Sequence, residues 1–201
     1  MSIGTGLSRA LGLTRNLLAV LGLVLSLAAV TIYAKGCTAT RDLDPRATMV
    51  LGEFGRKVLD GEPGAAMVVK MPLDEGVSIA DAVESMKLRA NQRNIKLVGR
   101  FALHKEFAAR SGKEFPYVEV FQFCDPDVAM RLLQGHPDFA AHMPCRIALY
   151  QDQAGRGWLV ALNLDLVIHG GRALPPEVRR EAIAIKDGLL DIMVAGAAGD
   201  L

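Results

Sequence analysis

The residues whose types and spacing best suit metal binding or thiol chemistry are two cysteines and two histidines. Cys124, His136, His142 and Cys145 follow the pattern Cys-x11-His-x5-His-x2-Cys. Two thiolates and two imidazoles could hold zinc in a tetrahedral site, but the close Cys-x2-Cys or His-x3-His pairs typical of such sites are missing. A metal site at these four residues is therefore the alternative interpretation, and we expect no metal and no other cofactor.

A disulfide between Cys124 and Cys145 is a stronger interpretation of the same residues, because an exported domain lies in an oxidising compartment. Bridged Cα atoms must lie within about 7 Å of each other. Parallel neighbouring strands joined by a crossover would place the two thiols at opposite ends and exclude the bridge. Two buried thiols in a core are the remaining interpretation. Cys37 could bridge to a partner, carry lipid or have no role.

Motifs of the familiar enzyme classes are missing from the sequence. It has no Cys-x-x-Cys-His for covalent haem, no Gly-x-Gly-x-x-Gly, no Walker loop and no Gly-x-Ser-x-Gly. Asp125, Asp127 and Asp138 lie near expected helix starts, where capping explains an acid. We therefore predict no catalytic residues and a protein that is not an enzyme.

The most apolar stretch of the exported part is the outermost hairpin's second strand, predicted at residues 157–166. If both faces of this strand are buried, one is covered by the core and the other by a partner chain. The residues expected to contact that partner are Trp158, Val160, Leu162, Leu164 and Leu166.

The overall composition excludes several classes of protein. The chain has 201 residues, with 23 Lys and Arg against 22 Asp and Glu. A formal net charge of +1 gives no support for nucleic-acid binding and none for a disordered acidic chain. The length suits one domain and an additional segment.

That additional segment is predicted to be a transmembrane helix at residues 16–34, which carry no charge. Nineteen residues at about 1.5 Å each span about 28 Å, close to the hydrocarbon core of a bilayer. A cleaved signal peptide and a lipoprotein signal ending at Cys37 are the alternatives, but both normally have shorter apolar regions and better cleavage sites.

The flanking charges predict the orientation of this helix. Arg9 and Arg15 lie in the leader, residues 1–15, without any acid, whereas Lys35 and Arg41 are accompanied by Asp42 and Asp44. By the positive-inside rule the amino terminus is cytoplasmic. We expect a single-pass protein of the inner membrane with its carboxy-terminal domain in the periplasm.

The rest of the chain alternates helical and strand-like segments. A polar tether at residues 35–43 precedes an amphipathic helix at 44–61, and the remaining domain covers 62–201. Ser78 and Asp81 resemble a capping box that begins a helix, and two further helices follow Asp125 and Pro175. The predicted strands are residues 66–71, 95–103, 117–124, 145–151 and 157–166.

This order predicts an α+β fold, with helices packed on one side of a largely antiparallel sheet. The last two strands are joined by a short Gly-containing loop that suits a hairpin.

Two motifs in the middle of the domain resemble a known family. They are Phe123-Cys124-Asp125-Pro126 with Ala129 and Leu132-Leu133, and the run Met143-Pro144-Cys145-Arg146-Ile147-Ala148-Leu149-Tyr150. Their order is similar to that of the domain of unknown function 302 family, over about residues 67–193. The resemblance implies a small α+β domain, often dimeric, with no agreed activity and no catalytic residues to transfer.

These observations lead to two expectations about function. The first is a non-catalytic, membrane-anchored accessory or assembly subunit of a larger integral membrane complex, respiratory or otherwise redox, in contact with lipid through residues 16–34. The second is a periplasmic module that handles a metal or small ligand through Cys124, Cys145 and the nearby histidines. A homodimer is compatible with either.

Overall fold

The computed structural model describes the backbone of residues 3–200, and the side chains of residues 15–200 except those of Cys37 and Ala39. The chain divides into two compact units, Met1–Leu43 and Asp44–Leu201.

The first unit is one long helix, α1 (Ile3–Thr40). Its segment Arg15–Gly36 has a mean hydropathy of 2.4 and is long and apolar enough to cross a membrane. This segment contains the whole predicted span. The first two residues of the predicted leader lie outside the described part of the chain, and the helix continues through much of the segment predicted as a tether.

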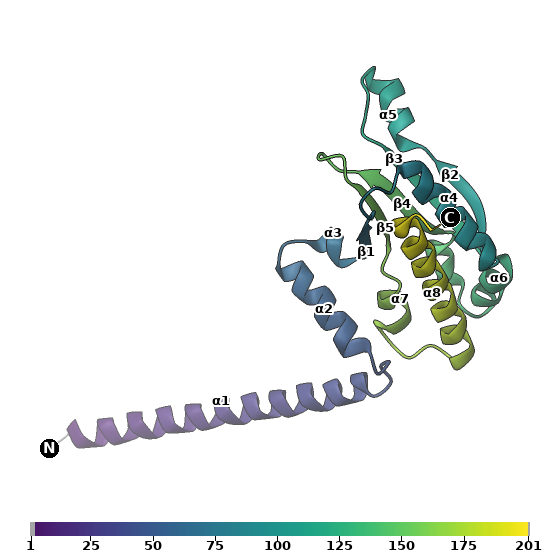
Figure 1. Cartoon of the computed structure of the whole chain (residues 1–201). Coiled ribbons are helices and arrows are strands. Elements are labelled where there is room, and N and C mark those ends of the chain that lie inside the picture. Colours follow the sequence, from purple (N-terminus) through teal and green to yellow (C-terminus); the bar gives the residue numbers. More distant parts are fainter. Residues whose placement is uncertain (1–2, 201) are drawn as a thin grey trace. The chain divides into compact units, whose positions relative to one another are not determined.

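The second unit is built on a five-stranded antiparallel sheet, which confirms the predicted α+β class (Figure 1). In space the strands follow the order β1-β5-β4-β3-β2. Their bounds are β1 (Val68–Pro72), β2 (Lys96–Phe101), β3 (Val118–Cys124), β4 (Cys145–Gln151) and β5 (Gly157–Leu162).

Two long helices, α4 (Ile79–Gln92) and α8 (Pro176–Ala198), pack against each other over one face of the sheet (Figure 1). The core lies between them and the strands, with Met86, Ile192 and Met193 fully buried. The other helices are α2 (Ala47–Leu59), α3 (Pro63–Ala66), α5 (Leu103–Ser111), α6 (Pro126–Gly135), the 3-10 helix η1 (Pro137–His142) and α7 (Asp165–His169).

The start of α4 confirms the predicted capping box. The Asp81 backbone N–H donates to the Ser78 hydroxyl at 3.1 Å, and the Asp81 carboxylate accepts from the Ser78 N–H at 3.3 Å. These contacts satisfy amide groups that would otherwise lack partners at a helix start.

Helix α2 lies within the predicted amphipathic segment and packs through one face. Ala47 and Val50 are buried, and Val50, Phe54 and Leu166 line a small cavity between α2 and α7. The amphipathic face of α2 is therefore covered in part by its own domain.

The prediction for the last strand was wrong about the residue at which the strand ends and about its position in the sheet. The strand stops at Leu162, because the Asn163 side chain accepts the Asp165 backbone N–H at 3.0 Å and turns the chain into α7. The strand is also not outermost: Val68 pairs with Leu162 and Met71 with Leu159, so β1 covers its free edge.

Candidate functional site

The four residues of the predicted Cys/His group lie near one end of the sheet without forming a ligand set. Cys124 is the last residue of β3, Cys145 the first residue of β4, His136 follows α6 and His142 ends η1. Within residues whose side chains are described, no three His, Cys, Asp or Glu side chains are arranged to hold a metal ion.

The two cysteines are both free in the structure. Strands β3 and β4 are antiparallel neighbours and Phe123 is opposite Cys145, so Cys124 lies one residue beyond the partner of Cys145. Both cysteines line one small cavity together with Phe123 and Met143, so the two thiols lie near each other at this end of the sheet. The disulfide stays a prediction.

The protonation of these thiols does not favour nucleophilic chemistry. Burial, and then the neighbouring Cys124, raise the pKa of Cys145 to about 11. Burial and the Asp125 carboxylate also raise the pKa of Cys124. Both groups are thiols rather than thiolates at neutral pH, whereas reactive cysteines have lowered pKa values.

The face of the sheet opposite α4 and α8 is the more distinctive surface, and we call it the open face. It carries the alternate residues of the central strands, among them Val120, Ala148 and Val160, which lie side by side in register and are partly exposed. In the described part of this unit no helix forms a layer over it (Figure 1).

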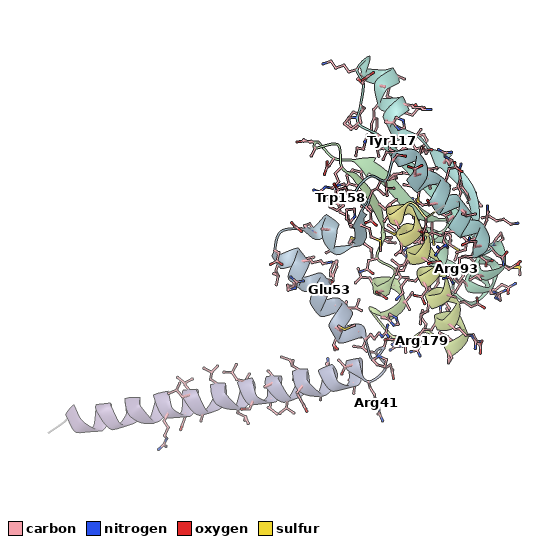
Figure 2. All side chains as sticks on the ribbon, in the orientation of Figure 1. Arg41, Glu53, Arg93, Tyr117, Trp158 and Arg179 are labelled. Atoms are coloured by element: carbon pink, nitrogen blue, oxygen red, sulfur yellow. The ribbon has the colours of Figure 1, made fainter. Side chains whose placement is uncertain are left out.

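Trp158, Tyr150 and Lys70 form a cluster on the open face, in β5, β4 and β1 respectively; Trp158 is labelled in Figure 2. The Lys70 Nζ lies 3.9 Å from the centroid of the Trp158 ring and 5.5 Å from that of Tyr150. The Trp158 Nε1–H donates to the Asp152 Oδ2 at 2.8 Å. The aromatic rings are therefore held in place by a cation and a carboxylate.

The Asp152 carboxylate already accepts hydrogen bonds within this cluster. The hydrogen bond from Trp158, followed by that from the Arg156 backbone, lowers the pKa of its carboxyl. The Arg156 guanidinium also lies 5.6 Å from the Trp158 ring centroid. The cluster thus presents cations beside its aromatic rings.

An open hollow of about 330 Å³ lies at the other end of the open face. Its lining combines apolar side chains with the guanidinium of Arg146 and the imidazole of His142. The lining residues are Val68, Val120, His142, Cys145, Arg146, Ala148, Val160, Ala161, Leu162, Leu164 and Leu189.

Three of the five predicted partner contacts lie on the open face. Trp158, Val160 and Leu162 are alternate residues of β5 and are partly exposed. Leu164 is buried, and Leu166 lies against α2. The last two residues leave the face because the chain turns after Leu162.

A buried network around Glu119 was not found from the sequence. The Arg100 Nε donates to Glu119 Oε1 at 2.7 Å, and the Tyr117 hydroxyl donates to Oε2 at 2.6 Å. Burial alone would raise the pKa of Glu119, but the hydrogen bonds from Arg100 and Tyr117 outweigh it and lower the pKa. Burial, and then Glu119, raise the pKa of Tyr117. The sequence did contain one signal for this network, an acidic residue at a position of β3 that faces the core.

A second buried network fixes the start of the domain. Asp44 accepts the Arg46 backbone N–H at 2.9 Å, and its carboxylate lies 3.1 Å from His169 Nδ1 and 3.4 Å from Arg179 Nη1. Burial opposes ionisation of Asp44, but the contacts with Arg46, His169 and Arg179 prevail and lower its pKa. This network joins the segment before α2 to α7 and α8.

Comparisons with known proteins agree with the fold. Residues 69–194, more than half of the chain, match the family described as Domain of unknown function DUF302. The crystal structure of an uncharacterized conserved DUF302 protein from Bacillus stearothermophilus is similar, with a TM-score of 0.52 and 15% sequence identity. The match covers 64% of this chain and 97% of that one. The curated proteins give no match.

Proposed function

Because the chain belongs to the DUF302 family, whose description assigns no activity, we propose its function from its own surface. The protein is a non-catalytic, membrane-anchored accessory or assembly subunit that docks onto a larger integral membrane complex, respiratory or otherwise redox. The open face of its sheet is the docking surface.

The observation that carries this proposal is the composition of the open face. It displays a tryptophan, a tyrosine and aliphatic residues in adjacent strands, and the Lys70 ammonium lies over both aromatic rings. Tryptophan, tyrosine and arginine dominate the binding energy of protein interfaces, and exposed apolar patches mark interaction sites.

The edges of the sheet are less suited to binding. On one edge, β1 has five residues, of which Lys70 is exposed and Pro72 lacks a backbone N–H. On the other edge, β2 is interrupted by a bulge between Leu97 and Gly99. Lysine, proline and bulges all discourage the addition of another strand, so the face is the better candidate.

The charge of the open face suggests the chemistry of the partner. Lys70 and Arg156 lie beside Trp158, and Arg146 lies at the opposite end. The neighbouring carboxylate, Asp152, already accepts hydrogen bonds from within the domain. A partner surface with acidic groups around apolar residues would complement this pattern.

The orientation of the protein in the membrane is part of the same proposal. The apolar segment of α1 lies in the inner membrane and contacts lipid, with the leader in the cytoplasm and the domain in the periplasm. Its support is the flanking charge, since Arg9 and Arg15 lack neighbouring acids. Protease added to spheroplasts should digest the domain; protection until the cells are lysed would contradict this orientation.

Site-specific photocrosslinking in native membranes tests the docking surface. Tyr150 on the open face is replaced by p-benzoylphenylalanine, and Phe115, an aromatic residue 50% exposed outside that face, is the matched control. We expect position 150, but not position 115, to give a product with an integral membrane protein. A product only with a second copy of the chain, or equal products at both positions, would contradict the proposal.

A pair of matched substitutions provides a second test. Val160→Asp places a charge on the open face, and Val194→Asp makes the same change at an exposed position of α8. After gentle detergent extraction, the Val160 variant should run free of the complex while the Val194 variant remains in it. Thermal unfolding of both variants checks that the domain is still folded.

The second candidate function is the handling of a small ligand. Its specific support is that Cys145 and His142, two residues of the predicted Cys/His group, line the same hollow.

A further inference from the structure

The hollow on the open face is large enough to be a binding site in its own right. Its volume of about 330 Å³ lies at the lower end of the range typical of small-molecule sites, about 300–1,000 Å³. At about 30 Å³ per water molecule, this space is equivalent to about eleven waters, or to a ligand segment of similar atom count.

Most of the hollow's lining is apolar. Val68, Ala148, Val160 and Leu162 come from three adjacent strands, and Leu164 follows the end of β5. The backbone groups of β4 and β5 are paired on both sides within the sheet. An apolar chain would therefore fill the hollow without leaving polar groups unpaired.

Arg146 is the charged side chain in the lining of the hollow. Arg146 is exposed, and within the described residues it forms no ion pair; His142 contributes an imidazole, and no Asp or Glu belongs to the lining. A guanidinium with free donors is suited to a carboxylate or phosphate, which it can bind through two parallel hydrogen bonds.

We propose that this hollow binds an amphiphilic anion, with its apolar chain against Val160, Ala148 and Leu162 and its carboxylate or phosphate at Arg146. The two anionic groups have different sources, a free fatty acid or a phospholipid. The site goes beyond the proposed docking function and does not depend on it, because ligand binding needs no partner protein.

Calorimetric titration of the full chain in amphipol tests the proposal with four ten-carbon probes below their critical micelle concentrations. The probes are decanoate, decyl phosphate, decanol and decyltrimethylammonium. We expect the two anions to bind at least tenfold more tightly than decanol, and the cation to bind most weakly. Tighter binding of decanoate points to a fatty acid, and tighter binding of decyl phosphate to a phospholipid.

Substitutions separate the head-group contact from the chain contact. Arg146→Gln should weaken decanoate binding about tenfold or more, as expected for a lost charge-assisted hydrogen bond, and leave decanol binding unchanged. Arg110→Gln, at another exposed arginine, is the matched control. Ala148→Leu should weaken the binding of all the probes because it fills the hollow. Trp158, the single tryptophan of the chain, reports by its emission that each variant is folded.

Equal binding of decanoate, decanol and the cation would overturn the proposal, as would identical effects of Arg146→Gln and Arg110→Gln. Neither result would affect the photocrosslinks of position 150, and loss of those crosslinks would not affect decanoate binding. The two proposals therefore fail independently.

Discussion

The two faces of the sheet carry similarly apolar residues, but helices cover one face and leave the other partly exposed. Phe121, Ile147 and Ala161 lie in one row across three strands and are buried beneath α4 and α8. The next row, Val120, Ala148 and Val160, is nearly as apolar but only partly covered. Apolar character therefore marks the core on one face, whereas on the other it lies on a partly exposed surface.

The largest difference between the two faces should appear in stability. Phe121→Ala removes a fully buried ring and should lower the free energy of unfolding by about 3–5 kcal/mol. Val120→Ala, the adjacent residue on the open face, should cost about 1 kcal/mol or less. Denaturant unfolding of both variants measures the difference. Similar losses would show that the open face is covered in solution.

The Glu119 network predicts an intermediate effect that depends on pH. Glu119→Gln keeps the size of the side chain but removes the charge that Arg100 and Tyr117 contact. At neutral pH we expect a loss of about 1–3 kcal/mol in the free energy of unfolding.

The sign of the pH dependence follows from the lowered pKa of Glu119. The folded protein holds the carboxylate more strongly than the unfolded chain does, so the stabilisation is present above the ordinary pKa of 4.5 and is lost as pH falls through the lower, folded value. The difference between wild type and Glu119→Gln should shrink in acid. A difference that stays constant from neutral pH into acid would exclude this explanation.

A smaller effect is expected for the cation on the open face. Lys70→Ala removes the contact with Trp158 and should cost about 0.5–1 kcal/mol, the usual range for an exposed cation–π pair. The emission of Trp158 should shift in the same variant. Lys105→Ala, at an exposed lysine in α5, should change neither quantity; a shift there would show that the emission does not report on the cluster.

The smallest effect concerns the cysteines. In the folded protein, alkylation of Cys145 should be slower than that of Cys124, because Cys145 is more deeply buried and its pKa is raised to about 11. After unfolding without reductant, mass spectrometry should find both residues alkylated, and reductant should leave the free energy of unfolding unchanged. A linked pair of peptides containing Cys124 and Cys145 would instead establish the disulfide.

Features that depend on neighbouring residues were predictable from the sequence. The capping box of Ser78 and Asp81 is complete within four residues, and the start of β4 at Cys145 follows the alternation of its own strand. The fold class also followed, because it depends on the order of such segments rather than on their exact ends.

Features that depend on distant residues were not predictable in the same way. Leu164 and Leu166 continue the alternation of β5, and the local hydrogen bond accepted by Asn163 overrides that pattern. The position of β5 inside the sheet depends on its pairing with β1, and period-two alternation carries no information about which strands are neighbours. Apolarity predicted a partner over the second face of β5, but it carried no information about the pairing of β1 with the edge of that strand.

The pairing of β1 with β5 has a consequence for biosynthesis. Val68 emerges from the ribosome long before its partner Leu162, and α4 emerges long before α8, which packs on it. Closing such long loops makes folding slow, and an early strand that waits with unpaired backbone groups is prone to aggregation. The amino-terminal half of this domain must therefore remain soluble until nearly the whole chain has been made, which creates a period in which a chaperone would be of use.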